Sequence, residues 1–164
     1  MTIERDEAES LLFREARLLD EGRLDEWRSM LTDDVVYRVP HNNVGDSRSQ
    51  VSIIFDEGDR LAGRIWRLQQ NGLNHSQDPP STTVRFVSNV ETEPAAPDGT
   101  VAIHCTLLLA AFRAATQRRD AEARTFAARC LYRMRRVDDA WKIAYKQVSL
   151  LEMDGVLPPM NFII

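Results

Sequence analysis

The side chains that could act as acids or bases in a pocket are few in this chain. Asp34 and Tyr37 stand where a short helix is predicted to pass into a strand, and His75 and His104 are the other side chains of suitable chemistry. A carboxylate near an imidazole or a phenol can transfer a proton, which is the task of a dehydratase, isomerase or cyclase. Asp33 and Asp34 serve equally well as turn residues, so a catalytic and a structural interpretation both stay open.

Ligands for a metal ion or an iron–sulfur cluster are scarce. The chain holds three histidines (His41, His75 and His104) and two cysteines (Cys105 and Cys130). Zinc sites and clusters use several closely spaced Cys or His ligands, and a mononuclear iron site uses two His and a carboxylate. His104 and Cys105 are neighbours in a predicted strand, so their side chains point to opposite faces and cannot share an ion. We therefore expect no metal site and no cofactor in this chain.

Length and composition are those of an ordinary globular protein. The 164 residues are 43% hydrophobic and 28% charged, with a net charge of −4, so we expect one domain over residues 1–164. The sequence has no glycine-rich phosphate-binding motif, and its charge gives no general attraction to nucleic acid or to a membrane surface. The charged N-terminal segment does not look like an export signal, and no apolar run is long enough to span a membrane. We expect a cytoplasmic protein.

The first third of the chain shows helical periodicity. Ala8, Leu12, Ala16 and Leu19 recur at the spacing of one helix face, and Gly22 follows as a predicted stop because glycine readily adopts the left-handed cap conformation.

Two shorter helices are also predicted. One begins near Leu24 and ends at Thr32–Asp34, and the other buries Leu61, Ile65 and Leu68.

The second half of the chain is rich in strand-forming residues, and the breaks between its strands contain turn residues such as Pro, Asp and Gly. Because no helix-length gap separates the last three strands, we expect antiparallel hairpins. The predicted strands are residues 35–40, 82–92, 100–116, 122–136 and 141–151.

The spacing of apolar residues predicts the register of the central hairpin. A symmetric turn near Gln117 places Val101 opposite Met134 and Cys105 opposite Cys130, and both apolar sets then fall on one face. We expect the two cysteines to be buried, reduced and packed as small hydrophobic side chains.

The same reasoning applies to the last hairpin. It predicts Ile143 opposite Met134 and Tyr145 opposite Tyr132. The result is an α+β fold, with about three N-terminal helices packed on a curved antiparallel or mixed β-sheet.

Several segments resemble one protein family over nearly the whole chain. The opening segments resemble that family and also, more widely, the cone-shaped proteins related to nuclear transport factor 2, which share a cystatin-like fold. Asp-Pro-Pro-Ser and Val-Ser-Asn-Val in the middle are more specific. The segments are residues 13–20, 24–27, 31–37, 64–68, 78–81, 85–90, 141–146 and 161–164. Together they resemble the small (β) subunit of aromatic-ring-hydroxylating dioxygenases.

This resemblance implies a division of labour. In that family the large (α) subunit carries the Rieske iron–sulfur cluster and the catalytic mononuclear iron, and the small subunit forms a trimeric platform for it. The resemblance thus implies a non-catalytic platform subunit that acts in aromatic compound catabolism and carries neither iron centre. Its implied partners are two further copies of itself and the α subunit. The family commonly has an arginine-rich segment after Pro-Pro-Ser, and only Arg85 matches it here.

One face of the arginine-rich strand over residues 122–136 suits a protein contact. Arg129 and Arg133 share this face with Leu131 and, from the preceding strand, with His104. Such a mixture of charged and apolar side chains is typical of an interface. We expect Arg85, His104, Arg129 and Arg133 to be interface residues of the homotrimer that the resemblance implies.

Two other functions remain open at this point, because one fold can host many activities. The chain could be a stand-alone dehydratase, isomerase or cyclase using Asp34, Tyr37, His75 and His104, or a ligand-binding module without chemistry. An enzyme would require these side chains to converge on an open cavity. A gene for an α subunit beside this one would favour the platform role.

Overall fold

The structure is a computed structural model that describes residues 2–41, 51–70, 79–117, 120–151 and 162–164. His75 lies outside these residues. The helices are α1 (Arg5–Asp20), α2 (Leu24–Ser29) and α3 (Gly58–Gln69). The strands are β1 (Leu31–Pro40), β2 (Ser52–Glu57), β3 (Thr82–Thr92), β4 (Val101–Arg113), β5 (Glu122–Val137) and β6 (Ala140–Leu150).

Helix α1 forms and ends as its sequence predicts. Ala8, Leu12, Ala16 and Leu19 are all buried on one side of it. Gly22 has a φ of 69°, in the left-handed region, and the N–H of the next residue, Arg23, donates to the carbonyl of Leu18 at 2.9 Å. This pattern of a left-handed glycine and a returning N–H is the usual cap at a helix C-terminus.

The predicted turn at Thr32–Asp34 is wrong. These residues lie in β1, which already begins at Leu31. The N–H of Ile143 donates to the carbonyl of Met30 at 2.9 Å, and Leu31 is paired with Ile143. The chain thus begins to pair with β6 directly after the short helix α2, so no turn separates α2 from β1. Helix α3 buries Leu61 and Ile65 as expected.

The six strands form one mixed sheet in the order β2-β1-β6-β5-β4-β3. The pairing of β1 with β6 is parallel, and the other neighbours are antiparallel. Strand β2 was not among the predicted strands, whereas β3, β4, β5 and β6 all lie where strands were predicted.

The register of the central hairpin is confirmed: Val101 pairs with Met134, and Cys105 pairs with Cys130. In the last hairpin, Ile143 pairs with Met134 as predicted, but the register then shifts between Arg133 and Met134.

Because of this bulge, the predicted pairing of Tyr145 with Tyr132 is wrong. Tyr145 pairs with Arg133, and Lys146 takes the place opposite Tyr132. A one-residue shift exchanges the two faces of a strand, so Lys146 points into the core.

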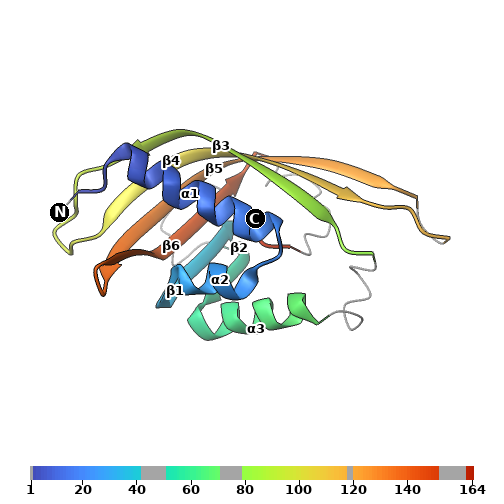
Figure 1. The fold of residues 1–164 in the computed structure, drawn as a ribbon, viewed down its shortest axis with the longest axis horizontal. Helices are drawn as coiled ribbons and strands as arrows, with labels where there is room; N and C mark the ends of the chain where they lie inside the picture. Colours follow the sequence, from blue (N-terminus) through green and yellow to red (C-terminus); the bar gives the residue numbers. More distant parts are fainter. Residues whose placement is uncertain (1, 42–50, 71–78, 118–119, 152–161) are drawn as a thin grey trace.

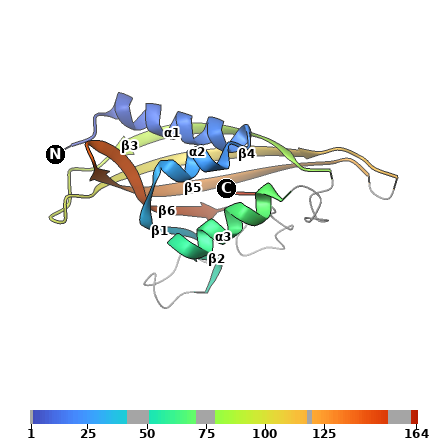
Figure 2. The ribbon, with the colours of Figure 1, turned by 60° about the horizontal axis from the view of Figure 1, so that its bottom comes forward.

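The helices lie over one face of the sheet (Figures 1 and 2). Helix α1 packs along β3, and α3 packs against β1 and β2. The hairpin of β4 and β5 extends well past the helices on the right of Figure 1. Between the helices and the sheet lies one hydrophobic cluster, which includes Leu12, Trp27, Ile103 and Met134. We call the face of the sheet toward the helices the covered face, and the opposite face of β3, β4 and β5 the open face.

Candidate functional site

The interior of the fold holds a buried ion pair. The Nζ atom of Lys146 lies 3.0 Å from Oε1 of Glu15, and the two side chains are only 2% and 3% exposed. Trp27 Nε1 donates to the same carboxylate oxygen at 2.9 Å, and the Tyr132 hydroxyl donates to Oε2 at 2.7 Å. Both oxygens of Glu15 are therefore hydrogen-bonded, as a buried carboxylate requires.

Aromatic rings complete the surroundings of Lys146. Its ammonium lies 5.5 Å from the ring centroid of Tyr132 and 5.9 Å from those of Trp27 and Tyr37. These distances suit cation–π attraction. Because partners already occupy both charges and water has no access to them, this cluster has the character of a structural element rather than of an acid–base pair.

The sequence analysis missed both charged members of this cluster. Glu15 lies within the buried stripe of α1, between Leu12 and Leu19, and that position was a detectable signal. Lys146 had no such signal, because the alternation of β6 places it on the opposite face unless the bulge is known.

Tyr37, a candidate for pocket chemistry, is 1% exposed and bonded to the backbone of the C-terminal segment. The Ile164 N–H donates to the Tyr37 hydroxyl oxygen at 3.1 Å, and that hydroxyl donates to the Ile164 carbonyl at 3.4 Å. Burial raises the pKa of Tyr37 to about 12. The phenol therefore stays protonated at neutral pH and holds the backbone in place.

Asp34 and His104 lie elsewhere. The Asp34 carboxylate is 66% exposed and forms a two-point ion pair with Arg135, whose hydrogen bonds lower the pKa of Asp34 to about 2. His104 Nε2 lies 2.8 Å from Glu93 Oε1 among exposed side chains. The structure thus does not bring Asp34, Tyr37 and His104 together in a common pocket.

Arg85 is buried rather than exposed at a surface. Its side chain is 3% exposed and pairs with Asp20 at the end of α1. The Thr83 hydroxyl donates to the same carboxylate at 2.9 Å, and the Arg85 backbone N–H donates to its other oxygen at 2.9 Å.

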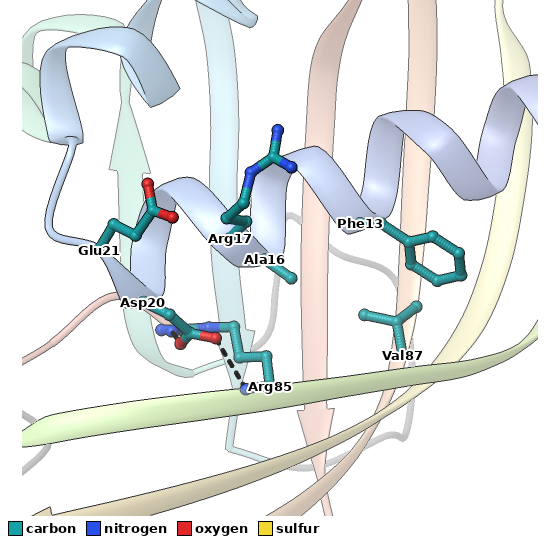
Figure 3. A pocket seen from close by; sticks show the side chains of 7 residues that line it. All are labelled: Phe13, Ala16, Arg17, Asp20, Glu21, Arg85 and Val87. Atoms are coloured by element: carbon teal, nitrogen blue, oxygen red, sulfur yellow. Dashed lines mark hydrogen bonds and ion pairs between the residues drawn. The ribbon is translucent and has the colours of Figure 1, made fainter.

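A hollow of about 400 Å³ lies between α1 and β3 (Figure 3), and the Asp20–Arg85 pair forms one end of it. Phe13 and Val87 lie together at the other end. The lining residues are Phe13, Ala16, Arg17, Asp20, Glu21, Arg85 and Val87.

The open face carries an apolar patch. Val84, Phe86, Leu108 and Phe112 are between 43% and 57% exposed. Register places Phe86 beside Leu108 across β3 and β4. Four large hydrophobic side chains gathered on one sheet face are typical of a protein contact.

Arginines continue this face across β5. Arg129 pairs with Thr106, next to the apolar patch, and Arg133 lies 5.8 Å from the ring centroid of Tyr145. Arg129 and Arg133 are both exposed, and His104 pairs with Leu131 as predicted. Sequence reasoning therefore placed these residues on the correct face.

The described residues contain neither a metal-binding cluster nor a membrane-spanning helix. No group of three or more His, Cys, Asp or Glu side chains is arranged to hold a metal ion among them. Likewise, none of the helices in the described part of the chain is long and apolar enough to cross a membrane.

Known proteins that resemble this chain in sequence and in fold include small or β subunits of dioxygenases. The small oxygenase component of the p-cumate 2,3-dioxygenase system of Pseudomonas putida is 29% identical over 159 residues, which cover 95% of this chain and 83% of that protein. The solved β subunit of benzoate 1,2-dioxygenase from Burkholderia mallei superposes with a TM-score of 0.72 at 25% identity, covering 92% of both chains.

A more distant structure shows the fold alone. A nuclear transport factor 2-like protein with a cystatin-like fold from Novosphingobium aromaticivorans matches with a TM-score of 0.56 at 18% identity, over 90% of this chain and 82% of that one.

The family model described as the ring hydroxylating beta subunit matches residues 14–154. The chain therefore belongs to the family of ring-hydroxylating β subunits.

Proposed function

We propose that this chain is the non-catalytic small subunit of an aromatic-ring-hydroxylating dioxygenase and acts as a structural platform for the α subunit. The observation that carries the proposal is the open face, where exposed apolar side chains from β3 and β4 adjoin the arginines of β5. The interior supports the non-catalytic role, because its buried charges, Glu15 and Lys146, are paired with each other and serve the structure. The family membership supports it as well.

In this proposal the redox centres belong to the α partner. The α subunit holds the Rieske cluster and the mononuclear iron. The small subunit supports the α subunit, and the complex is cytoplasmic. The reaction oxidises an aromatic ring, in line with the aromatic substrates in the names of the relatives.

Self-association is the second part of the proposal. Three copies of the small subunit associate through the open face, with His104, Arg129 and Arg133 at the contact. The face has the mixed composition of an interface, apolar at Phe86 and Leu108 and cationic at its margin. Arg85 acts indirectly, through β3, because its own side chain is buried.

Co-expression with a dioxygenase α subunit, to be sought in the neighbourhood of this gene, tests the proposal. We expect the two chains to co-purify at one to one, with iron and ring-hydroxylating activity in the complex. The small subunit purified alone should be colourless and hold no stoichiometric iron. About one tightly held iron per small subunit, or an α subunit that is equally active and stable without it, would contradict the platform role.

A further inference from the structure

The segment Phe162–Ile164 lies inside the molecule although it belongs to no strand or helix. Ile163 and Ile164 are 2% and 0% exposed, and the ring of Phe162 packs edge-on against Phe126 with centroids 5.8 Å apart. Figures 1 and 2 both show this end of the chain near the middle of the view rather than at the periphery. Burial of these two branched side chains favours this position, because it removes their apolar surface from water.

Side chains of two strands bind the backbone of this segment. An Nη of Arg85 in β3 donates to the carbonyl of Ile163. Tyr37 in β1 both accepts from the N–H of Ile164 and donates to its carbonyl. Two strands at distant places in the sheet order thus bind the peptide group between Ile163 and Ile164, and Tyr37 also binds the next oxygen, that of Ile164.

Arg85 is held ready for this contact by the end of α1. Asp20 binds its guanidinium and its backbone N–H, and Thr83 binds the same carboxylate. The Nε of Arg85 is buried and has no hydrogen-bond partner among the described residues.

We propose that Arg85 and Tyr37, with the apolar wall that includes Phe126, form a binding site for an extended, branched aliphatic peptide segment. Residues 162–164 are its built-in occupant. The site accepts ligands that present carbonyl oxygens on consecutive residues beside two branched side chains. This inference does not depend on the platform function, because the site lies on the covered face, away from the open face.

A full-length variant with a weakened occupant tests the site. In Ile163→Ser/Ile164→Ser the chain keeps its length but loses the branched side chains. A fluorescent peptide of sequence Asn-Phe-Ile-Ile should bind this variant saturably and at least tenfold more tightly than the wild type, where the occupant competes. A peptide with both isoleucines replaced by aspartate should not bind.

Two further substitutions in that variant separate the site from nonspecific binding. Tyr37→Phe removes one hydroxyl and should weaken peptide binding at least fivefold. Arg17→Gln changes an exposed arginine of the adjacent hollow and should leave binding unchanged. No saturable binding up to millimolar peptide, or equal binding by Tyr37→Phe, would overturn the proposal.

Hydrogen exchange in the wild-type chain decides the matter if the serine variant does not fold. The Ile164 amide should exchange slowly, and Tyr37→Phe should accelerate it at least tenfold. Tyr145→Phe is the matched control, because its hydroxyl bonds to Gln147 and not to the segment. An Ile164 amide that exchanges freely in the wild type would rule the site out.

Discussion

Cys105 and Cys130 face each other across β4 and β5, and both are buried free thiols. A hydrogen bond with Cys105 that favours the protonated thiol, together with burial, raises the pKa of Cys130 well above its ordinary value. The thiolate is the reactive form of cysteine, so a raised pKa and lack of access both suppress its reactivity.

We expect a thiol reagent at pH 8 to leave the folded protein unlabelled and to add two labels per chain in denaturant without reductant. The intact mass of the chain gives the number of labels in the folded and in the denatured protein. Labelling of the native chain would contradict the buried position, and an unlabelled denatured chain would indicate a disulfide.

Asp34 contributes a small, pH-dependent stability. Its pKa is about 2 in the folded protein against an ordinary 3.8, so the contribution is present above about pH 4 and is lost as the pH falls toward 2. Because the pair is exposed, we expect Asp34→Asn to lower the free energy of unfolding by less than about 1 kcal/mol at pH 7. Urea unfolding at pH 7 and pH 2.5 measures the change.

Arg135→Gln serves as the matched variant for this pair. At pH 7 it should lower the free energy of unfolding as much as Asp34→Asn does. The double variant Asp34→Asn/Arg135→Gln should lower it no more than either single variant. A difference between Asp34→Asn and wild type that is as large at pH 2.5 as at pH 7 would contradict the assignment to this ion pair.

At the scale of elements, the bulge between Arg133 and Met134 is the feature with the largest consequence. It moves Lys146 to the covered face, where Glu15 of α1 binds it. Helix α1 is thereby tied to β6 by a buried charge pair as well as by hydrophobic contact. Removing one member of a buried pair leaves an uncompensated charge, and the cost is about 3–5 kcal/mol.

We therefore expect Lys146→Met to lower the free energy of unfolding by about 3–5 kcal/mol, measured by urea unfolding at pH 7. Lys142→Met on the same strand is the control and should change it by less than about 0.5 kcal/mol, because Lys142 is a half-exposed residue outside the buried network. The double variant Glu15→Gln/Lys146→Met should lose less unfolding free energy than the sum of the losses in the two single variants. Additive losses would mean that the two charges do not interact.

At the scale of the whole molecule, the two faces of the sheet have different roles. The covered face holds the hydrophobic cluster, and the open face keeps large apolar side chains exposed beside arginines. Substitutions on the open face should therefore change association and leave folding intact, which separates the proposed assembly from the stability of the chain.

We expect Arg129→Glu/Arg133→Glu to weaken self-association at least tenfold, about 1.4 kcal/mol, because reversed charges at a desolvated contact lose their partners. Sedimentation at tens of micromolar measures this, and the unfolding curve should stay close to that of wild type. Arg14→Glu/Arg17→Glu makes the same change in net charge on exposed positions of α1 and should associate normally. A wild-type monomer, or equal association of both variants, would contradict the proposed interface.

Much of the fold was readable from local patterns. The apolar stripe of α1 and the stop at Gly22 depend on residues within one or two turns, and the central hairpin register depends on alternation about a single short turn. The open face was readable for the same reason, since alternation that buries Cys130 also exposes Arg129 and Arg133.

Contacts between segments that are distant in the chain could not be read from local patterns. The parallel pairing of β1 with β6 overrode the turn chemistry of Thr32–Asp34, and one bulge brought Lys146 to Glu15. Tyr37 looked like a pocket residue until the structure placed Ile164 against its hydroxyl. Sequence spacing determines the faces of each element on its own, whereas contacts between elements far apart in the chain arise only when the whole core packs, because their free energy depends on every partner being in place.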